Sequence, residues 1–129
     1  MNTLYEEKIF SPDGYIIDEE NNTFYRFFQF DKNEVFLKFR YDENFSLTEI
    51  NITFEKGAQN EKSVFVFVEN CLKAFINNEN IYDTLSKKIN LSKTLCKNTL
   101  KTKEAETKNI KMCVDVSDIG SVISVTRII

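Results

Sequence analysis

Histidine and tryptophan are absent from this chain of 129 residues, which also holds a single proline and only three glycines. Without an imidazole, the chain by itself cannot build a Ser-His-Asp triad, a Cys-His pair or the common histidine-based zinc sites. Gly14, Gly57 and Gly120 are too far apart for a Walker A loop or another glycine-rich phosphate cradle. We therefore expect no enzyme of these classes, no cofactor and no metal site.

Membrane and export signals are lacking as well. No apolar run approaches the roughly 20 residues that cross a bilayer, so we expect no membrane span. Residues 1–10 lack the basic start and apolar stretch of a signal peptide. Cys71, Cys96 and Cys113 are odd in number and widely spaced, unlike a disulfide framework or a Cys-x-x-Cys metal site. Reduced thiols favour the cytoplasm, and export stays open if a signal preceded this chain.

Carboxylates are the remaining groups for acid–base chemistry. Pairs of them hydrolyse glycosides, and the visible clusters fall in expected turns: Asp18, Glu19, Glu20, Asp42 and Glu43. Acidic residues are common in turns, so we interpret these as solvated turn residues. Asp31 and Asn33 begin like a calcium loop, but the later ligands and the glycine of such a loop are missing. A carboxylate enzyme is the last of our alternatives.

The composition is otherwise that of an ordinary folded chain with many aromatic rings. Apolar residues make up 42% and charged residues 29%, with 12 Phe and 5 Tyr. This length and composition predict one soluble domain over residues 1–129. The net charge of -3 provides no overall basic field for nucleic acid. Because proline and glycine are scarce, the turns must rely on Asn and Asp.

Hydrophobic periodicity predicts strands first and helices next. Three β-prone runs separated by Asp- and Asn-rich turns predict a meander: Thr23 to Phe30, Glu34 to Tyr41 and Ser46 to Glu55. An opening hairpin is expected between Leu4 to Phe10 and Tyr15 to Ile17. After residue 60 the period changes from two to about 3.6, which predicts helices over 61–77 and 81–89.

The tail returns to strand patterns and completes the predicted fold. Residues 99–103 suit a modest edge strand, and residues 110–114 and 122–129 suit a closing hairpin around the turn Ser117-Asp118-Ile119-Gly120. The predicted fold class is α+β. It is a two-layer sandwich in which two helices pack on one face of a mainly antiparallel sheet, built from the meander and the C-terminal hairpin.

This order of elements, from the Phe24 to Phe54 meander through the two helices to the closing hairpin, resembles small uncharacterised domains of Gram-positive secreted lipoproteins. The resemblance rests on element order and spacing, and it implies an α+β domain of bacterial origin. No motif residue carries a function across. The chain differs from such proteins because it has no lipidation cysteine near its start.

The register of the meander divides its side chains between two faces. If Phe30 pairs with Val35 and Tyr41 with Ser46, the core face is aromatic and aliphatic: Phe24, Phe28, Phe30, Val35, Leu37, Phe39, Tyr41, Ile50, Ile52 and Phe54. Arg26 falls on that face too, in conflict with the register, and we place it at a sheet edge. The opposite face holds the candidate binding residues, which are Tyr25, Phe27, Phe36, Lys38 and Arg40.

The three cysteines are expected in different surroundings. Cys71 belongs to the apolar stripe of the first helix, so we expect it to be buried as a small hydrophobe. That stripe consists of Val64, Phe67, Val68, Cys71, Leu72 and Phe75. Cys113 alternates with Met112 and Val114 and is expected on the second sheet face, while Cys96 is the expected exposed thiol. Without a histidine nearby, none is a convincing nucleophile.

A solvent-facing surface this aromatic is expected to be covered, because monomers rarely leave large apolar patches exposed. The candidates for covering this surface are the N-terminal segment, a second copy of the chain, another protein, or single-stranded nucleic acid whose phosphates meet Lys38 and Arg40. Nucleic acid is the least favoured. The predicted function is a non-enzymatic protein-interaction or binding domain. The alternatives are a small mobile-element inhibitor of a host protein and a carrier of an apolar small molecule between sheet and helix.

Overall fold

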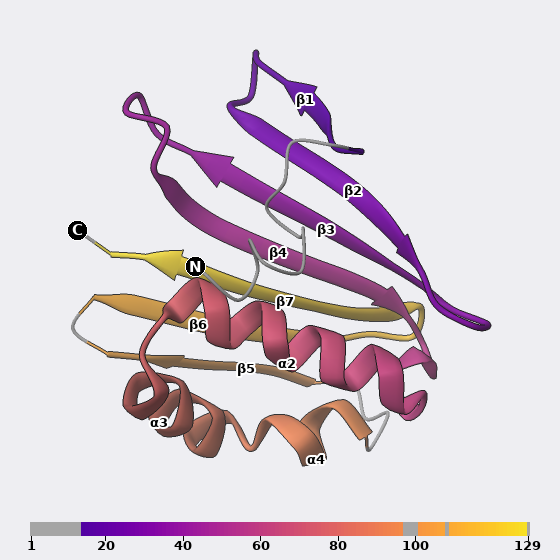
Figure 1. Ribbon diagram of the computed structural model, residues 1–129. Coiled ribbons are helices and arrows are strands. Elements are labelled where there is room, and N and C mark those ends of the chain that lie inside the picture. Colours follow the sequence, from indigo (N-terminus) through magenta and orange to yellow (C-terminus); the bar gives the residue numbers. More distant parts are fainter. Residues whose placement is uncertain (1–13, 97–100, 108, 129) are drawn as a thin grey trace.

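A seven-stranded antiparallel sheet carries the fold, with helices on one of its faces (Figure 1). The computed structural model describes residues 14–96, 101–107 and 109–128. The strand order across the sheet is β1-β2-β3-β4-β7-β6-β5, so the C-terminal hairpin joins the meander through β4 and β7. The predicted two-layer α+β sandwich is confirmed.

The elements follow in the predicted order. The strands are β1 (Ile16–Asp18), β2 (Thr23–Gln29), β3 (Glu34–Tyr41), β4 (Leu47–Glu55), β5 (Lys101–Glu106), β6 (Ile110–Val116) and β7 (Gly120–Arg127). The helices are the 3-10 turn η1 (Ala58–Asn60), α2 (Lys62–Ile76), α3 (Glu79–Ile89) and α4 (Leu91–Cys96). Periodicity does not predict the six-residue α4, which is too short to show a helical period. The predicted strand over Leu4 to Phe10 lies outside the described residues. No helix in the described part of the chain is long and apolar enough to cross a membrane.

The pairing of β2 with β3 differs from the predicted one. Val35 lies opposite Phe28 rather than Phe30. The turn closes earlier because the Phe30 N–H donates to the Asn33 carbonyl at 2.7 Å, which leaves Phe30 beyond the strand. The shift is two residues, so every side chain of β2 keeps its predicted face.

The pairing of β3 with β4 is also shifted. Tyr41 lies opposite Leu47 rather than Ser46, and a bulge follows Arg40. Before the bulge, Phe39 pairs with Ile50 and Leu37 with Ile52, again two residues away from the predicted partners. An even shift preserves the faces, whereas the bulge locally breaks the alternation at the end of β3.

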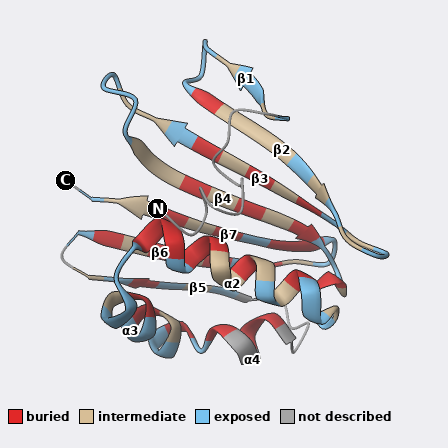
Figure 2. Ribbon diagram, viewed as in Figure 1, coloured by how far each residue is buried: buried red, intermediate tan, exposed pale blue. Residues whose placement is uncertain are grey.

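The core lies between the sheet and the helices, where Figure 2 shows most of the buried residues. Six of the ten predicted core residues of the meander are buried: Val35, Leu37, Phe39, Ile50, Ile52 and Phe54. The other four, Phe24, Phe28, Phe30 and Tyr41, are half-buried, because they lie toward the β1 edge of the sheet, which the helices cover only in part (Figure 2). The α2 stripe is buried as predicted except for Phe67, which is half-buried against Phe28 and Phe30 at ring distances of 4.9 and 5.1 Å.

Arg26 lies on the core face of β2, just past the three residues that pair with β1. Its guanidinium carbon sits 4.6 Å from the centre of the Phe28 ring and 6.0 Å from that of Tyr15. The negative face of an aromatic ring attracts a cation, so these two rings stabilise the Arg26 guanidinium. The half-buried position near the edge therefore accommodates a charge that the predicted register alone could not explain.

Asparagine ends the two longer helices, α2 and α3, in a chain where glycine is scarce. Asn77 and Asn90 adopt left-handed backbone angles (φ 54° and 56°) at the C-termini of α2 and α3. Asn78 caps the start of α3 by accepting a hydrogen bond from the Ile81 N–H at 3.1 Å. These are the positions where a short polar side chain tolerates or satisfies the backbone.

Cys71 is fully buried, as its place in the α2 stripe predicts. Cys113 is half-buried on the outer sheet face, where burial, then Glu104 and Asp115, raise the pKa of its thiol. The Cys96 side chain lies outside the described residues. We expect an alkylating reagent to modify Cys113 well before Cys71 in the native protein, because reagent must reach a thiolate. Peptide mass spectrometry resolves the two sites, and equal rates for both would contradict the assigned face of α2.

Candidate interaction surface

The strands β2 and β3 place the five predicted site residues on the sheet face away from the helices. Across the pair, Tyr25 lies opposite Lys38, Phe27 opposite Phe36, and Arg40 opposite Thr23. The alternation that buries Leu37 and Phe39 points the residues between them outward. We call Tyr25, Phe27, Phe36, Lys38 and Arg40 the outer-face patch.

Three aromatic rings form the centre of the outer-face patch. The Phe36 ring lies 4.8 Å from Phe27 and 5.5 Å from Tyr25, both in tilted arrangements. Phe27 is 53% exposed, and Ile16, opposite Tyr25 on β1, is 54% exposed. Rings at these separations stabilise one another. The cluster is therefore a connected apolar surface rather than scattered side chains.

The two basic residues of the outer-face patch differ in whether they already form an ion pair. Arg40 forms an ion pair with Glu49 of β4, with 3.6 Å between Nε and Oε2. Lys38 has no ion pair within the described part of the chain. Asp18 lies near Lys38, and the pKa of its carboxyl is lowered chiefly by a hydrogen bond from Asn21 and only weakly by Lys38. Lys38 is thus the more available cation of the patch.

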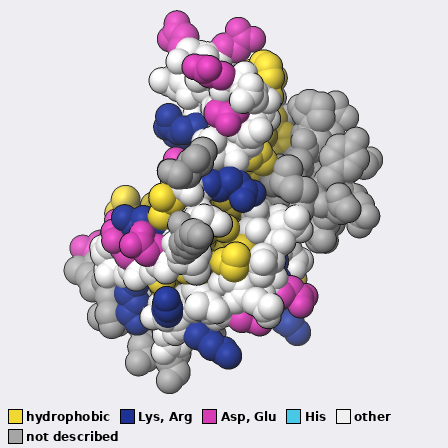
Figure 3. Space-filling view, turned by 90° about the vertical axis from the view of Figure 1, so that its left-hand side faces the viewer, with side chains coloured by type: hydrophobic (Ala, Val, Ile, Leu, Met, Phe, Trp, Pro, Cys, Tyr) yellow, Lys and Arg dark blue, Asp and Glu magenta, His cyan; other side chains and the backbone are white. Residues whose placement is uncertain are grey.

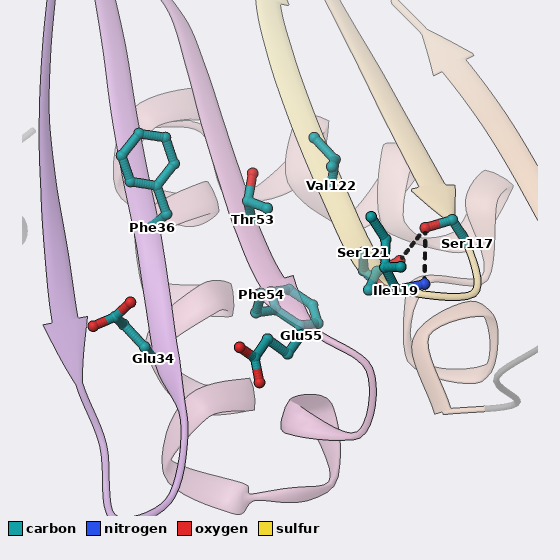
Figure 4. A pocket seen from close by; sticks show the side chains of 10 residues that line it. Glu34, Phe36, Thr53, Phe54, Glu55, Ser117, Ile119, Ser121 and Val122 are labelled. Carbon is teal, nitrogen blue, oxygen red and sulfur yellow. Dashed lines mark hydrogen bonds between the residues drawn. The ribbon is translucent and has the colours of Figure 1, made fainter.

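A hollow of about 410 Å³ adjoins the patch at Phe36. Figure 4 shows the side chains of Phe36, Thr53 and Val122 projecting from β3, β4 and β7, with the helices behind the strands. Ile119 borders the hollow from the β6–β7 turn, where the Ser117 hydroxyl donates to the Gly120 carbonyl at 3.1 Å and accepts from the Ile119 N–H at 3.4 Å. Ile119 is 84% exposed. The apolar surface therefore continues across four neighbouring strands, β2, β3, β4 and β7.

Two carboxylates lie at one end of this hollow, Glu34 on β3 and Glu55 on β4 (Figure 4). Sequence reasoning overlooked both. Glu34 carried a usable signal, because it precedes Phe36 by two residues and so shares its face. Thr53 and Glu55 join the site through the pairing of β3 with β4, which the predicted meander contains. Val122 joins only through the pairing of β4 with β7, which links residues about 70 positions apart. The face is therefore acidic at one end and basic at the other.

The acidic clusters that could suggest carboxylate chemistry lie at exposed turns. Acidic side chains gather at the end of the molecule formed by the β1–β2 and β3–β4 turns, at the top of Figure 3. There Asp42 accepts hydrogen bonds from the backbone N–H groups of Asn44 (2.8 Å) and Ser46 (3.0 Å). Asp18 accepts hydrogen bonds from the backbone N–H of Asn21 at 3.4 Å and from the side-chain amide of the same residue at 2.7 Å. In the described residues no three acidic or cysteine side chains are grouped so as to hold a metal ion.

A second hollow, of about 400 Å³, lies between α2 and α3. Its polar wall includes the Tyr82 hydroxyl, which donates to Glu69 at 3.3 Å, and burial raises the pKa of Tyr82 to about 12. Neither of these two hollows lies between the sheet and α2, where the carrier hypothesis places its cavity.

A comparison of this chain with protein-family models, curated proteins and solved structures finds no match. The fold and the surface define a two-layer α+β domain with an aromatic sheet face left open by its own described elements. The resemblance to lipoprotein domains stays a prediction, because no relative tests it.

Proposed function

We propose that this protein is a non-enzymatic interaction domain that binds another protein surface through the outer-face patch. The observation that carries the proposal is the cluster of Tyr25, Phe27 and Phe36, held in contact on a regular sheet with Phe27 53% exposed. Tyrosine, phenylalanine and arginine are enriched where proteins bind one another. Rigid strands present these rings without the entropy that a mobile loop would lose on binding.

A protein partner fits this face better than nucleic acid does. The Arg40 cation already pairs with Glu49, and Glu34 and Glu55 stand on the same face. Backbone phosphates would meet those carboxylates, while the chain as a whole carries a charge of -3. An inhibitor that occludes a host protein is one form of the same proposal, because it would use the same face.

The patch is tested by replacing Tyr25 and Phe36 together with serine. We expect the variant to stay folded, with a free energy of unfolding lowered by about 1 to 2 kcal/mol, because the two half-buried rings contact each other but lie outside the core. Association should be lost, since aromatic anchors carry most of the energy of an interface. The readouts are a denaturant melt, sedimentation velocity, and the proteins retained by the tagged domain from lysate of its own cells.

The matched control is Phe45→Ser, which removes a ring that is 81% exposed in the β3–β4 turn, away from the patch. It should leave association unchanged. A Tyr25→Ser/Phe36→Ser variant that stays folded and keeps its partners and oligomeric state would refute the proposal. A variant that unfolds would instead show that the face is structural, and Phe27→Ser, at the most exposed ring of the cluster, then repeats the test.

A further inference from the structure

We propose that the partner of the outer face is a second copy of this chain, packed face to face about a twofold axis that crosses the strands along the Phe36 row. This inference rests on the proposed function and names its partner. A twofold interface requires one surface that complements itself: whatever lies on one side of the axis must attract what lies on the other. The pattern of side chains on this face meets that requirement.

Across the middle of the face runs a row of four uncharged side chains, one from each of the neighbouring strands β2, β3, β4 and β7. The registers place Phe27 opposite Phe36, Phe36 opposite Thr53, and Thr53 opposite Val122. Phe27 is 53% and Val122 38% exposed, so apolar surface is available along the row. We call these four residues the central row.

Opposite charges flank the central row at equal distances. Along β3, Lys38 follows Phe36 by two residues and Glu34 precedes it by two, which is about 7 Å on either side at the rise of a strand. On the neighbouring strand β4, Asn51 lies beside Lys38, and Glu55 lies at the acidic end of the hollow with Glu34. One side of the row is therefore basic and polar, and the other is acidic.

A twofold axis along the central row exchanges these two sides. Lys38 of one copy then faces Glu34 of the second, and Glu34 of the first faces Lys38 of the second, so the contact forms twice. Both groups are available, because the ion pairs within the described residues are Arg40–Glu49 and Lys111–Glu104. The same axis brings Phe27 and Phe36 of one copy onto the apolar row of the other.

The area of the face suits such a dimer. At a strand spacing of about 4.8 Å and a rise of about 3.3 Å per residue, the four strands of the central row present a face of roughly 500 Å². Two such faces bury about 1,000 Å² in total, which is the lower end of the range for specific protein interfaces. Sheets that pack face to face also keep their strands within about 30° of one another, which the antiparallel arrangement about this axis allows.

A charge-swap series tests the inference by sedimentation equilibrium on the full chain. Glu34→Lys and Lys38→Glu each replace two attractive contacts with two repulsive ones, so each should weaken dimerisation about tenfold or more. The double variant Glu34→Lys/Lys38→Glu restores opposite charges across the axis and should bring the dissociation constant back to within about threefold of the original. Lys62→Glu, on the exposed surface of α2, is the control with the same charge change and should have no effect.

Each alternative result has a distinct meaning. A chain that stays monomeric up to about 100 µM, a concentration above the usual range for interfaces of this size, overturns the second-copy inference. The proposed function survives that result if another protein is lost with Tyr25→Ser/Phe36→Ser. A dimer that survives those serine substitutions uses another surface and overturns both. A dimer that the double charge swap fails to restore overturns the twofold axis while leaving the patch as the interface.

Discussion

Replacing Phe39 with alanine is expected to lower the free energy of unfolding by about 4 kcal/mol. Phe39 is fully buried on β3, where its ring stacks on Phe24 at 5.1 Å and pairs across the sheet with Ile50. Removing it leaves a cavity at the junction of the sheet and helix layers. The total free energy of unfolding of a small domain is about 5 to 15 kcal/mol, so the expected loss is a large fraction of it. Denaturant melts at constant m-value measure the loss.

Two alanine variants serve as internal controls for Phe39→Ala. Phe36 lies three residues earlier on β3 and on the outer face. Phe36→Ala should lower the free energy of unfolding of the isolated chain by less than about 1 kcal/mol, because little apolar area is removed from the core. Phe67 on α2 is half-buried and should fall between the two. A loss at Phe36 as large as that at Phe39 would mean that the two sheet faces have been exchanged.

Gly120→Ala is expected to destabilise the fold by about 3 kcal/mol, which is large for a single methyl group. Gly120 begins β7 opposite Glu55, and an added Cβ would overlap the carbonyl oxygen of Phe54 and approach the Glu55 Cα to 3.1 Å. Both are backbone atoms of β4, which cannot rotate away. The strands would have to separate at the pairing that joins the meander to the C-terminal hairpin.

Gly57→Ala is the matched control for this substitution. Nothing lies within 4 Å of a Cβ added at Gly57, whose φ of 94° only strains a side chain locally. The expected cost is about 1 kcal/mol. Thermal melts of the two variants compare them directly. If Gly120→Ala lowers the melting temperature no more than Gly57→Ala does, β7 does not approach β4 as closely as described.

The predicted fold depended on patterns that local chemistry imposes. Alternation along β3 and the 3.6-residue stripe of α2 each follow from which side chains avoid water, and they needed no knowledge of the partner elements. The outer position of Tyr25 and Phe36 followed in the same way. Even the incorrect hairpin pairings preserved these faces, since a shift of two residues leaves the alternation intact.

The composition alone shows that no site built from this chain holds an imidazole, because a side chain that is absent at every position cannot be supplied by folding. Only the tertiary structure decided what continues the outer face beyond the meander. Pairing of β4 with β7 brings Val122 beside Thr53, and the β6–β7 turn places Ile119 at the border of the same hollow. Such contacts join residues far apart in the sequence, and local periodicity carries no information about which strands become neighbours.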